Sequence, residues 1–160
     1  MNSLKDVLNE KAKANALLMD GKYSTAESAY KNILDNIENI LKDENVENKN
    51  EILEQKKLIM SNLAFSLKKQ YKISEGMKYD RIIIKKLDKS FAKSYARLIE
   101  GYLDQDKISM ARYHYDLMKA NVDKEIIDKC SEVINKLNEK LQIKDQNIDS
   151  LLMIKNMLLK

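Results

Sequence analysis

One pattern occurs three times along this chain: two residues twelve positions apart, most of them small, on neighbouring segments of helical periodicity. The three pairs are Ala14 with Ala26, Ala64 with Gly76, and Ile99 with Ala111. Small side chains at paired positions let two helix backbones approach closely, and stacked helix pairs bury their core against their neighbours. The step from Gly76 to Ala111 is 35 residues and the step from Ala26 to Gly76 is 50, so one boundary between units carries an insertion.

Composition agrees with a helical array. The 160 residues include no proline and only three glycines, so few positions would stop a helix. The sequence predicts an all-α fold of three helix-turn-helix repeats. The repeats span about 5–40, 50–88 and 91–121, a capping helix spans 123–142, residues 1–145 form one domain, and 146–160 form a helical extension or continuation.

Capping residues suggest where several helices begin and end. Gly21 suits the left-handed turn after the first helix. Ser24 is expected to cap the second helix, with Glu27 completing a capping box three residues later. Ser90 and Asp123 are expected to cap two later helices.

Charge and cysteine content narrow the class of protein. The net charge is +4, from 29 basic and 25 acidic residues, which is too balanced for nucleic-acid binding but favours acidic partners mildly. The single cysteine, Cys130, cannot form an internal disulfide, and no leader pattern is present, so we expect a cytoplasmic protein. The most apolar run, 148–159, is too short and too interrupted to cross a membrane.

Residues 11–30, KAKANALLMDGKYSTAESAY, resemble the first repeat of co-chaperone tetratricopeptide repeat (TPR) domains. The long second and third helices around the polar insert 42–50 resemble the TPR tails of large immunophilins, which are peptidyl-prolyl isomerases. The resemblance covers about 5–142 and implies a right-handed superhelix with a concave groove. Three features depart from the family: the proline that usually ends each repeat is absent, Asp80 replaces an aromatic residue, and Ile99 replaces the small residue of the third unit.

Co-chaperone TPR domains of this type hold the last residues of a chaperone that ends in Glu-Glu-Val-Asp. The resemblance implies that the acidic C-terminal tail of heat-shock protein 90 or 70 is the partner, and that five residues form a carboxylate clamp. These residues are Lys11, Asn15, Asn62, Lys93 and Arg97. Residues 11 and 15, like 93 and 97, are one helical turn apart and face the same way. Gripping two carboxylates in a partly desolvated groove needs several such donors.

By the same resemblance, the two asparagines would bind the terminal carboxylate and Lys11 would supply charge. Lys93 would hold the side-chain carboxylate of the last residue, and Arg97 an acid further upstream. Three further residues are expected around the peptide: Leu18 and Phe65 as an apolar pocket for the penultimate valine, and Lys69 as a donor to the peptide backbone.

No other chemistry is suggested by the sequence. It contains no glycine-rich phosphate loop, no Ser-His-Asp set and no Cys-x-x-Cys, and His114 is the only histidine. We therefore expect no catalysis, cofactor or metal site within this chain. Two alternatives stay open: the tail of a peptidyl-prolyl isomerase whose catalytic domain lies outside these residues, and a TPR scaffold that ignores chaperone tails. The preferred chaperone and the oligomeric state are not specified by these patterns.

Overall fold

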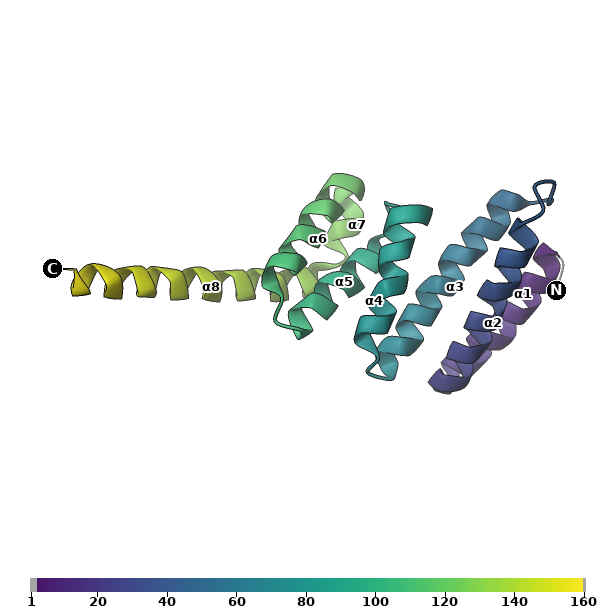
Figure 1. Cartoon of the computed structure of the whole chain (residues 1–160), viewed down its shortest axis with the longest axis horizontal. Helices are drawn as coiled ribbons and strands as arrows, with labels where there is room; N and C mark the ends of the chain where they lie inside the picture. Colours follow the sequence, from purple (N-terminus) through teal and green to yellow (C-terminus); the bar gives the residue numbers. More distant parts are fainter. Residues whose placement is uncertain (1–2, 160) are drawn as a thin grey trace.

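The chain folds as a stack of helices, seen in a computed structural model that describes residues 3–159 (Figure 1). The elements are α1 (Leu4–Met19), α2 (Tyr23–Leu41), α3 (Lys49–Lys69), α4 (Ile73–Ile82), the π-helical turn η1 (Ile83–Leu87), α5 (Ala92–Asp104), α6 (Ile108–Asn121), α7 (Lys124–Asp128) and α8 (Ser131–Leu158). The predicted all-α class is confirmed. Residues 1, 2 and 160, which the predicted domain ranges include, lie outside the described residues.

The same turn joins the helices of three successive pairs, α1–α2, α3–α4 and α5–α6. Its middle residue has a positive φ each time: 74° at Gly21, 60° at Tyr71 and 57° at Asp106. The next residue donates its N–H to a carbonyl five positions upstream, a bond typical of a Schellman helix end. These bonds are Lys22 to Leu17 (2.9 Å), Lys72 to Leu67 (2.9 Å) and Lys107 to Tyr102 (2.8 Å). The three helix pairs are therefore one structural unit used three times.

The paired positions of the sequence pattern lie in the core, as predicted. Ala14, Ala26, Ile99 and Ala111 are fully buried, and Ala64 is nearly so. The second pair shows the close approach most directly, because a Cβ built on Gly76 would lie 3.0 Å from the carbonyl oxygen of Ala64. Any side chain at residue 76 would press on the α3 backbone.

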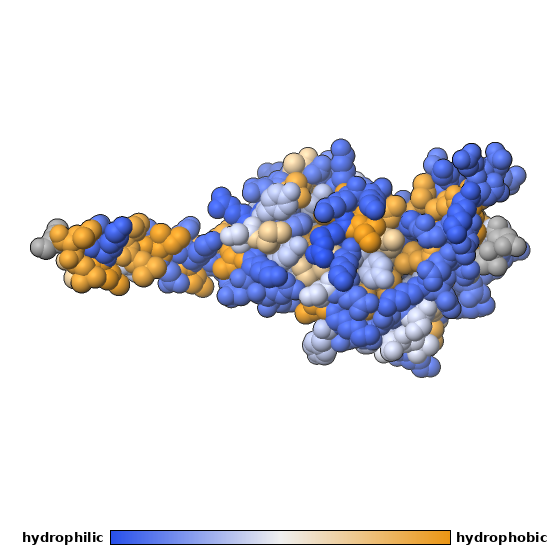
Figure 2. All heavy atoms as spheres, in the orientation of Figure 1, coloured by the Kyte–Doolittle hydropathy of each residue, from blue (hydrophilic) through white to orange (hydrophobic). Residues whose placement is uncertain are grey.

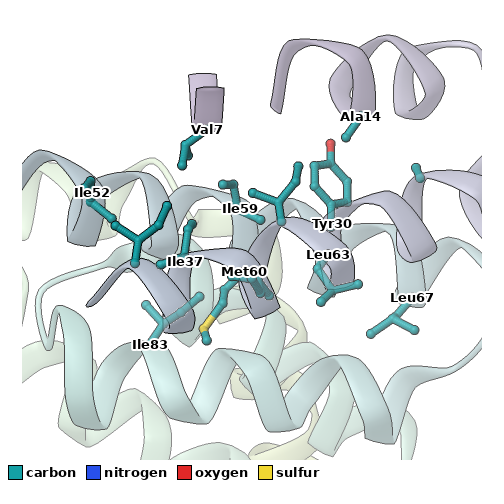
Figure 3. Packing of buried hydrophobic residues seen from close by; sticks show 14 residues of the cluster. Val7, Ala14, Tyr30, Ile37, Ile52, Ile59, Met60, Leu63, Leu67 and Ile83 are labelled. Carbon is teal, nitrogen blue, oxygen red and sulfur yellow. The ribbon is translucent and has the colours of Figure 1, made fainter. Parts of the chain in front are cut away.

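Neighbouring helices share two hydrophobic clusters. The first joins α1, α2, α3 and η1, with Tyr30, Ile59 and Leu63 fully buried (Figure 3). The second joins α4 to α8, with Leu98 and Leu137 fully buried. Since α3 packs on α1, α2 and α4, it carries packing from one repeat to the next.

The C-terminal region is divided differently from the prediction. Instead of one helix over 123–142, the chain forms the short α7, turns at Lys129 and Cys130, and then forms α8 without a break up to Leu158. The turn lets α7 pack on α6 while α8 packs on both α5 and α6. The tail is thus a continuation of α8, which projects from the stack with an apolar surface (Figures 1 and 2). No helix among the described residues is long and apolar enough to span a membrane.

The predicted capping box of α2 is wrong. The helix begins at Tyr23, and no side chain caps it. The Glu27 carboxylate instead accepts hydrogen bonds from Lys31 Nζ (2.8 Å), Gln70 Nε2 (2.8 Å) and Lys72 Nζ (3.1 Å). Burial alone would raise the pKa of Glu27, but these three hydrogen bonds lower it to about 2. Glu27 therefore ties the first repeat to the turn of the second.

The two other predicted caps also differ from expectation. Ser90 Oγ donates to Asp88 Oδ1 at 2.6 Å, and α5 starts only at Ala92. Asp123 does occupy the position before α7, but its side chain makes no capping hydrogen bond. The Ser90 hydroxyl bonds to the Asp88 carboxylate instead of capping α5.

Candidate peptide-binding face

The five predicted clamp residues lie on the first helices of the three pairs. Lys11 and Asn15 are on α1, Asn62 is on α3, and Lys93 and Arg97 are on α5. We call the surface of these three helices that carries the five residues the clamp face. α1 packs on α3, and side chains of α3 bond to side chains of α5, so the clamp face is continuous.

The two asparagines are in direct contact. Asn15 Oδ1 accepts hydrogen bonds from Tyr30 Oη at 2.6 Å and from Asn62 Nδ2 at 2.9 Å. Burial raises the pKa of Tyr30 to about 12, an effect that its hydrogen bond with Asn62 opposes, so the phenol stays protonated as a donor. Because no buried polar side-chain atom among the described residues lacks a partner, the unbonded Nδ2 of Asn15 reaches solvent. Tyr30 and Asn62 therefore fix the Asn15 side chain so that its amide nitrogen can donate to a ligand.

Lys11 extends the polar row at one end. Its Nζ donates to Gln55 Oε1 at 2.8 Å, a neutral acceptor on α3. Partial burial lowers the pKa of Lys11, and the nearby carboxylate of Glu54 opposes that shift. Sequence reasoning missed Gln55, although it lies seven residues before Asn62 and hence on the same helical face. The seven-residue spacing from Asn62 could have identified Gln55 from the sequence.

Arg97 is held more tightly than the resemblance implied. Its Nε donates to both oxygens of Asp80, at 3.1 and 3.0 Å, and its Nη2 donates to Asp80 Oδ1 at 2.7 Å and to Ser61 Oγ at 2.8 Å. The Asp80 side chain is 2% exposed and that of Arg97 15%. Burial raises the pKa of Asp80, while Arg97 and a 2.8 Å hydrogen bond from Ser94 oppose the rise. Asp80, the departure from the aromatic pattern, is thus compensated by Arg97 of the next repeat.

Lys93 is the most available cation of the clamp face. It is exposed on α5 one turn before Arg97, and its side-chain ammonium group forms no hydrogen bond or ion pair with any described residue. Its charge is therefore free to meet an acid from outside the chain.

The three residues expected around the peptide are placed less compactly. Leu18 on α1 is half-buried against the first hydrophobic cluster. Phe65 on α3 is exposed, and Lys69 Nζ lies 5.4 Å from the centre of its ring. Phe65 and Lys69 thus form a cation–π pair on the surface of α3.

Other reactive groups do not assemble into a site. The described residues contain no group of three or more His, Cys, Asp or Glu that could hold a metal ion. Cys130 is half-buried at the start of α8, and burial raises the pKa of its thiol, which disfavours the nucleophilic thiolate.

Comparison with known proteins adds no family. No protein-family model matches the chain, and a search of curated proteins gives no match. The case for a function therefore rests on the helix-pair architecture and on the clamp face.

Proposed function

We propose that this chain is a three-repeat TPR module that binds the acidic C-terminal tail of heat-shock protein 90 or 70 in the cytoplasm, as a co-chaperone. The observation that carries the proposal is the pair of touching amides, Asn15 and Asn62, flanked by Lys11 on one side and Lys93 on the other. Amide donors between two cations suit a ligand that bears two carboxylates at its end.

The geometry suggests how the roles divide. The outward Nδ2 of Asn15 would donate to the terminal carboxylate, with Asn62 and Tyr30 holding its amide in place and Lys11 adding charge. Lys93, which has no partner of its own, would hold the side-chain carboxylate of the last residue. Arg97 has only Nη1 left without a bond, and Asp80 offsets its charge. Its main contribution would be to fix α5, and hence Lys93, against α3 and α4.

A fluorescence-polarisation titration with a free-acid peptide ending in Glu-Glu-Val-Asp tests the proposal. Amidation of its C-terminus removes one carboxylate charge. A charge-assisted hydrogen bond contributes about 1.5–3 kcal/mol, so amidation, Lys93→Ala and Asn15→Ala should each weaken binding by roughly 10–100-fold.

Matched controls lie on the same helices. Lys13→Ala alters an exposed lysine of α1 that is paired with Glu10, and should leave peptide affinity unchanged, whereas Lys11→Ala should lower it. Arg97→Ala is a poor single test because it also strands the Asp80 carboxylate. Equal affinity for the free-acid and amidated peptides would refute the carboxylate clamp, and it would favour a scaffold that does not bind chaperone tails.

A further inference from the structure

A pocket opens between α4, α5 and α6, and none of the clamp residues lines it. Its volume is about 270 Å³. The residues that matter for its chemistry are Arg81 of α4, Lys85 of η1, Lys89 of the following loop, Tyr102 of α5, and Tyr113 and His114 of α6. We call it the α4–α6 pocket.

The charge around this pocket is entirely positive. Arg81, Lys85 and Lys89 contribute three cations, and no carboxylate lines it. Arg81 Nη1 donates to Tyr102 Oη at 3.3 Å, a neutral acceptor, and Arg81 makes no ion pair with a carboxylate of any described residue within 4 Å, although its charge is felt by Asp80. Lys85 and Lys89 are exposed, and neither side-chain ammonium group forms a hydrogen bond or ion pair with any described residue. Three cations around one cavity, two of them with ammonium groups that have no partner, favour an anion.

The wall of the pocket is built from aromatic rings. The Tyr102 and His114 rings have centroids 4.9 Å apart at an interplanar angle of 32°. The Tyr113 ring meets His114 edge-on, at 5.2 Å and 85°, and Tyr113 is 55% exposed. A row of three rings that ends in an exposed one offers a surface on which a further planar ring can stack.

His114 contributes one polar atom that has no partner. Its ring is 4% exposed, and Nδ1 lies 2.9 Å from the carbonyl oxygen of Met110, which can only accept, so Nδ1 carries the proton. No buried polar side-chain atom among the described residues is unpaired, so Nε2 must be accessible to solvent. Burial lowers the pKa of His114, the hydrogen bond with Met110 opposes that shift, and the charges of Arg81 and Lys85 add to it, so Nε2 is an acceptor.

We propose that the α4–α6 pocket binds a phosphate group carried on or near a single planar ring. The phosphate would be held by Arg81, Lys85 and Lys89, and the ring would stack beside Tyr102 and Tyr113. A volume of about 270 Å³ lies just below the roughly 300 Å³ at which pockets for drug-sized ligands begin, so the ligand is small. This chemistry occurs in a phosphotyrosine side chain and in a pyrimidine nucleoside monophosphate.

The lone histidine makes the test direct. In a 15N- or 13C-labelled sample of the full chain, the ring resonances of His114 are the only histidine signals. Titration with phenyl phosphate at pH 7 should shift them saturably, and at least tenfold more tightly than inorganic phosphate or phenol. No saturable shift, or equal affinity for inorganic phosphate, would overturn the proposal.

Variants of exposed lysines identify the cations without disturbing the core. Lys85→Ala combined with Lys89→Ala should weaken phenyl phosphate binding at least tenfold, whereas Lys86→Ala, on the same turn but outside the pocket, should not. Lys93→Ala should leave this binding intact, which separates the pocket from the clamp face. Equal affinity of the double variant and the unaltered chain would refute the assignment.

Two further titrations distinguish the sources of the ligand. N-acetyl-phosphotyrosine amide and uridine monophosphate are added to the same labelled sample, and the tighter ligand names the source. Binding of either supports the proposal, and failure of both to shift His114 overturns it.

Discussion

The buried ion pair between Asp80 and Arg97 gives the most quantitative test of how the repeats are held together. Asp80→Asn keeps an acceptor for Ser94 but leaves the Arg97 guanidinium, which is 15% exposed, without an opposite charge. Removing one partner of a buried pair costs about 3–5 kcal/mol, because the remaining charge is desolvated without compensation. We expect a loss near the lower end for Asp80→Asn, since Arg97 retains some access to water, and a similar loss for Arg97→Gln.

The double variant, with Asn at residue 80 and Gln at residue 97, isolates the interaction. It replaces two charges by neutral groups that can still exchange a hydrogen bond, so its loss should be smaller than the two single losses added together. Urea unfolding of the four proteins should give a coupling energy of about 3 kcal/mol. The Glu10–Lys13 pair, whose side chains are 41% and 72% exposed, is the control, and should give roughly 0–1 kcal/mol. A coupling energy no larger than the control would refute the structural role of the buried pair.

The pH dependence of Arg97→Gln provides an independent check. Without the guanidinium, burial acts unopposed by that charge, so the folded-state pKa of Asp80 rises further above its ordinary value of 3.8. A raised carboxyl pKa means that stability is retained below the unfolded-state pKa and lost as the pH rises through the folded-state pKa. The stability deficit of Arg97→Gln should therefore be small at pH 4 and full at pH 7. A deficit that does not change with pH would contradict this account.

Three further predictions concern other parts of the stack. Hydrogen bonds lower the pKa of Glu27 from 4.5 to about 2, so its contribution of about 3 kcal/mol to stability should be present above pH 4.5 and lost as the pH falls towards 2. The difference in unfolding free energy between the unaltered chain and Glu27→Gln, measured in urea, should therefore shrink from pH 4.5 to pH 2. A difference that stays constant would contradict this prediction. Tyr71→Gly should raise the melting temperature, with a gain of about 1 kcal/mol, because the side chain is 90% exposed while φ is 60°; a lower melting temperature would count against strain at this turn. Deleting 146–160 should leave the urea midpoint unchanged, because every described residue from 146 to 159 is exposed, and a lower midpoint would mean that the end of α8 supports the stack.

The sequence alone determined the features that depend on local periodicity. The absence of proline and the helical spacing of apolar residues specify an all-α chain, since each helix satisfies its own backbone hydrogen bonds. The small residues Ala64 and Gly76 predict the close approach of two helices, because a larger side chain at residue 76 would press on the backbone of the neighbouring helix. Positions one turn apart, such as Lys11 and Asn15, share a face by helix geometry. The identity of the ligand for that face remains a proposal.

The tertiary structure decided everything that joins residues distant in the sequence. In the sequence, Asp80 only departs from the repeat pattern. The structure shows that its carboxylate accepts hydrogen bonds from Arg97, 17 residues away. The left-handed turn at Tyr71 follows from its equivalence in space to Gly21, since a tyrosine carries no local signal for a positive φ. Gly101 shows no special pattern, yet a Cβ there would lie 2.6 Å from Met77 Sδ on the neighbouring helix. Such contacts depend on how helices cross, which local periodicity does not specify.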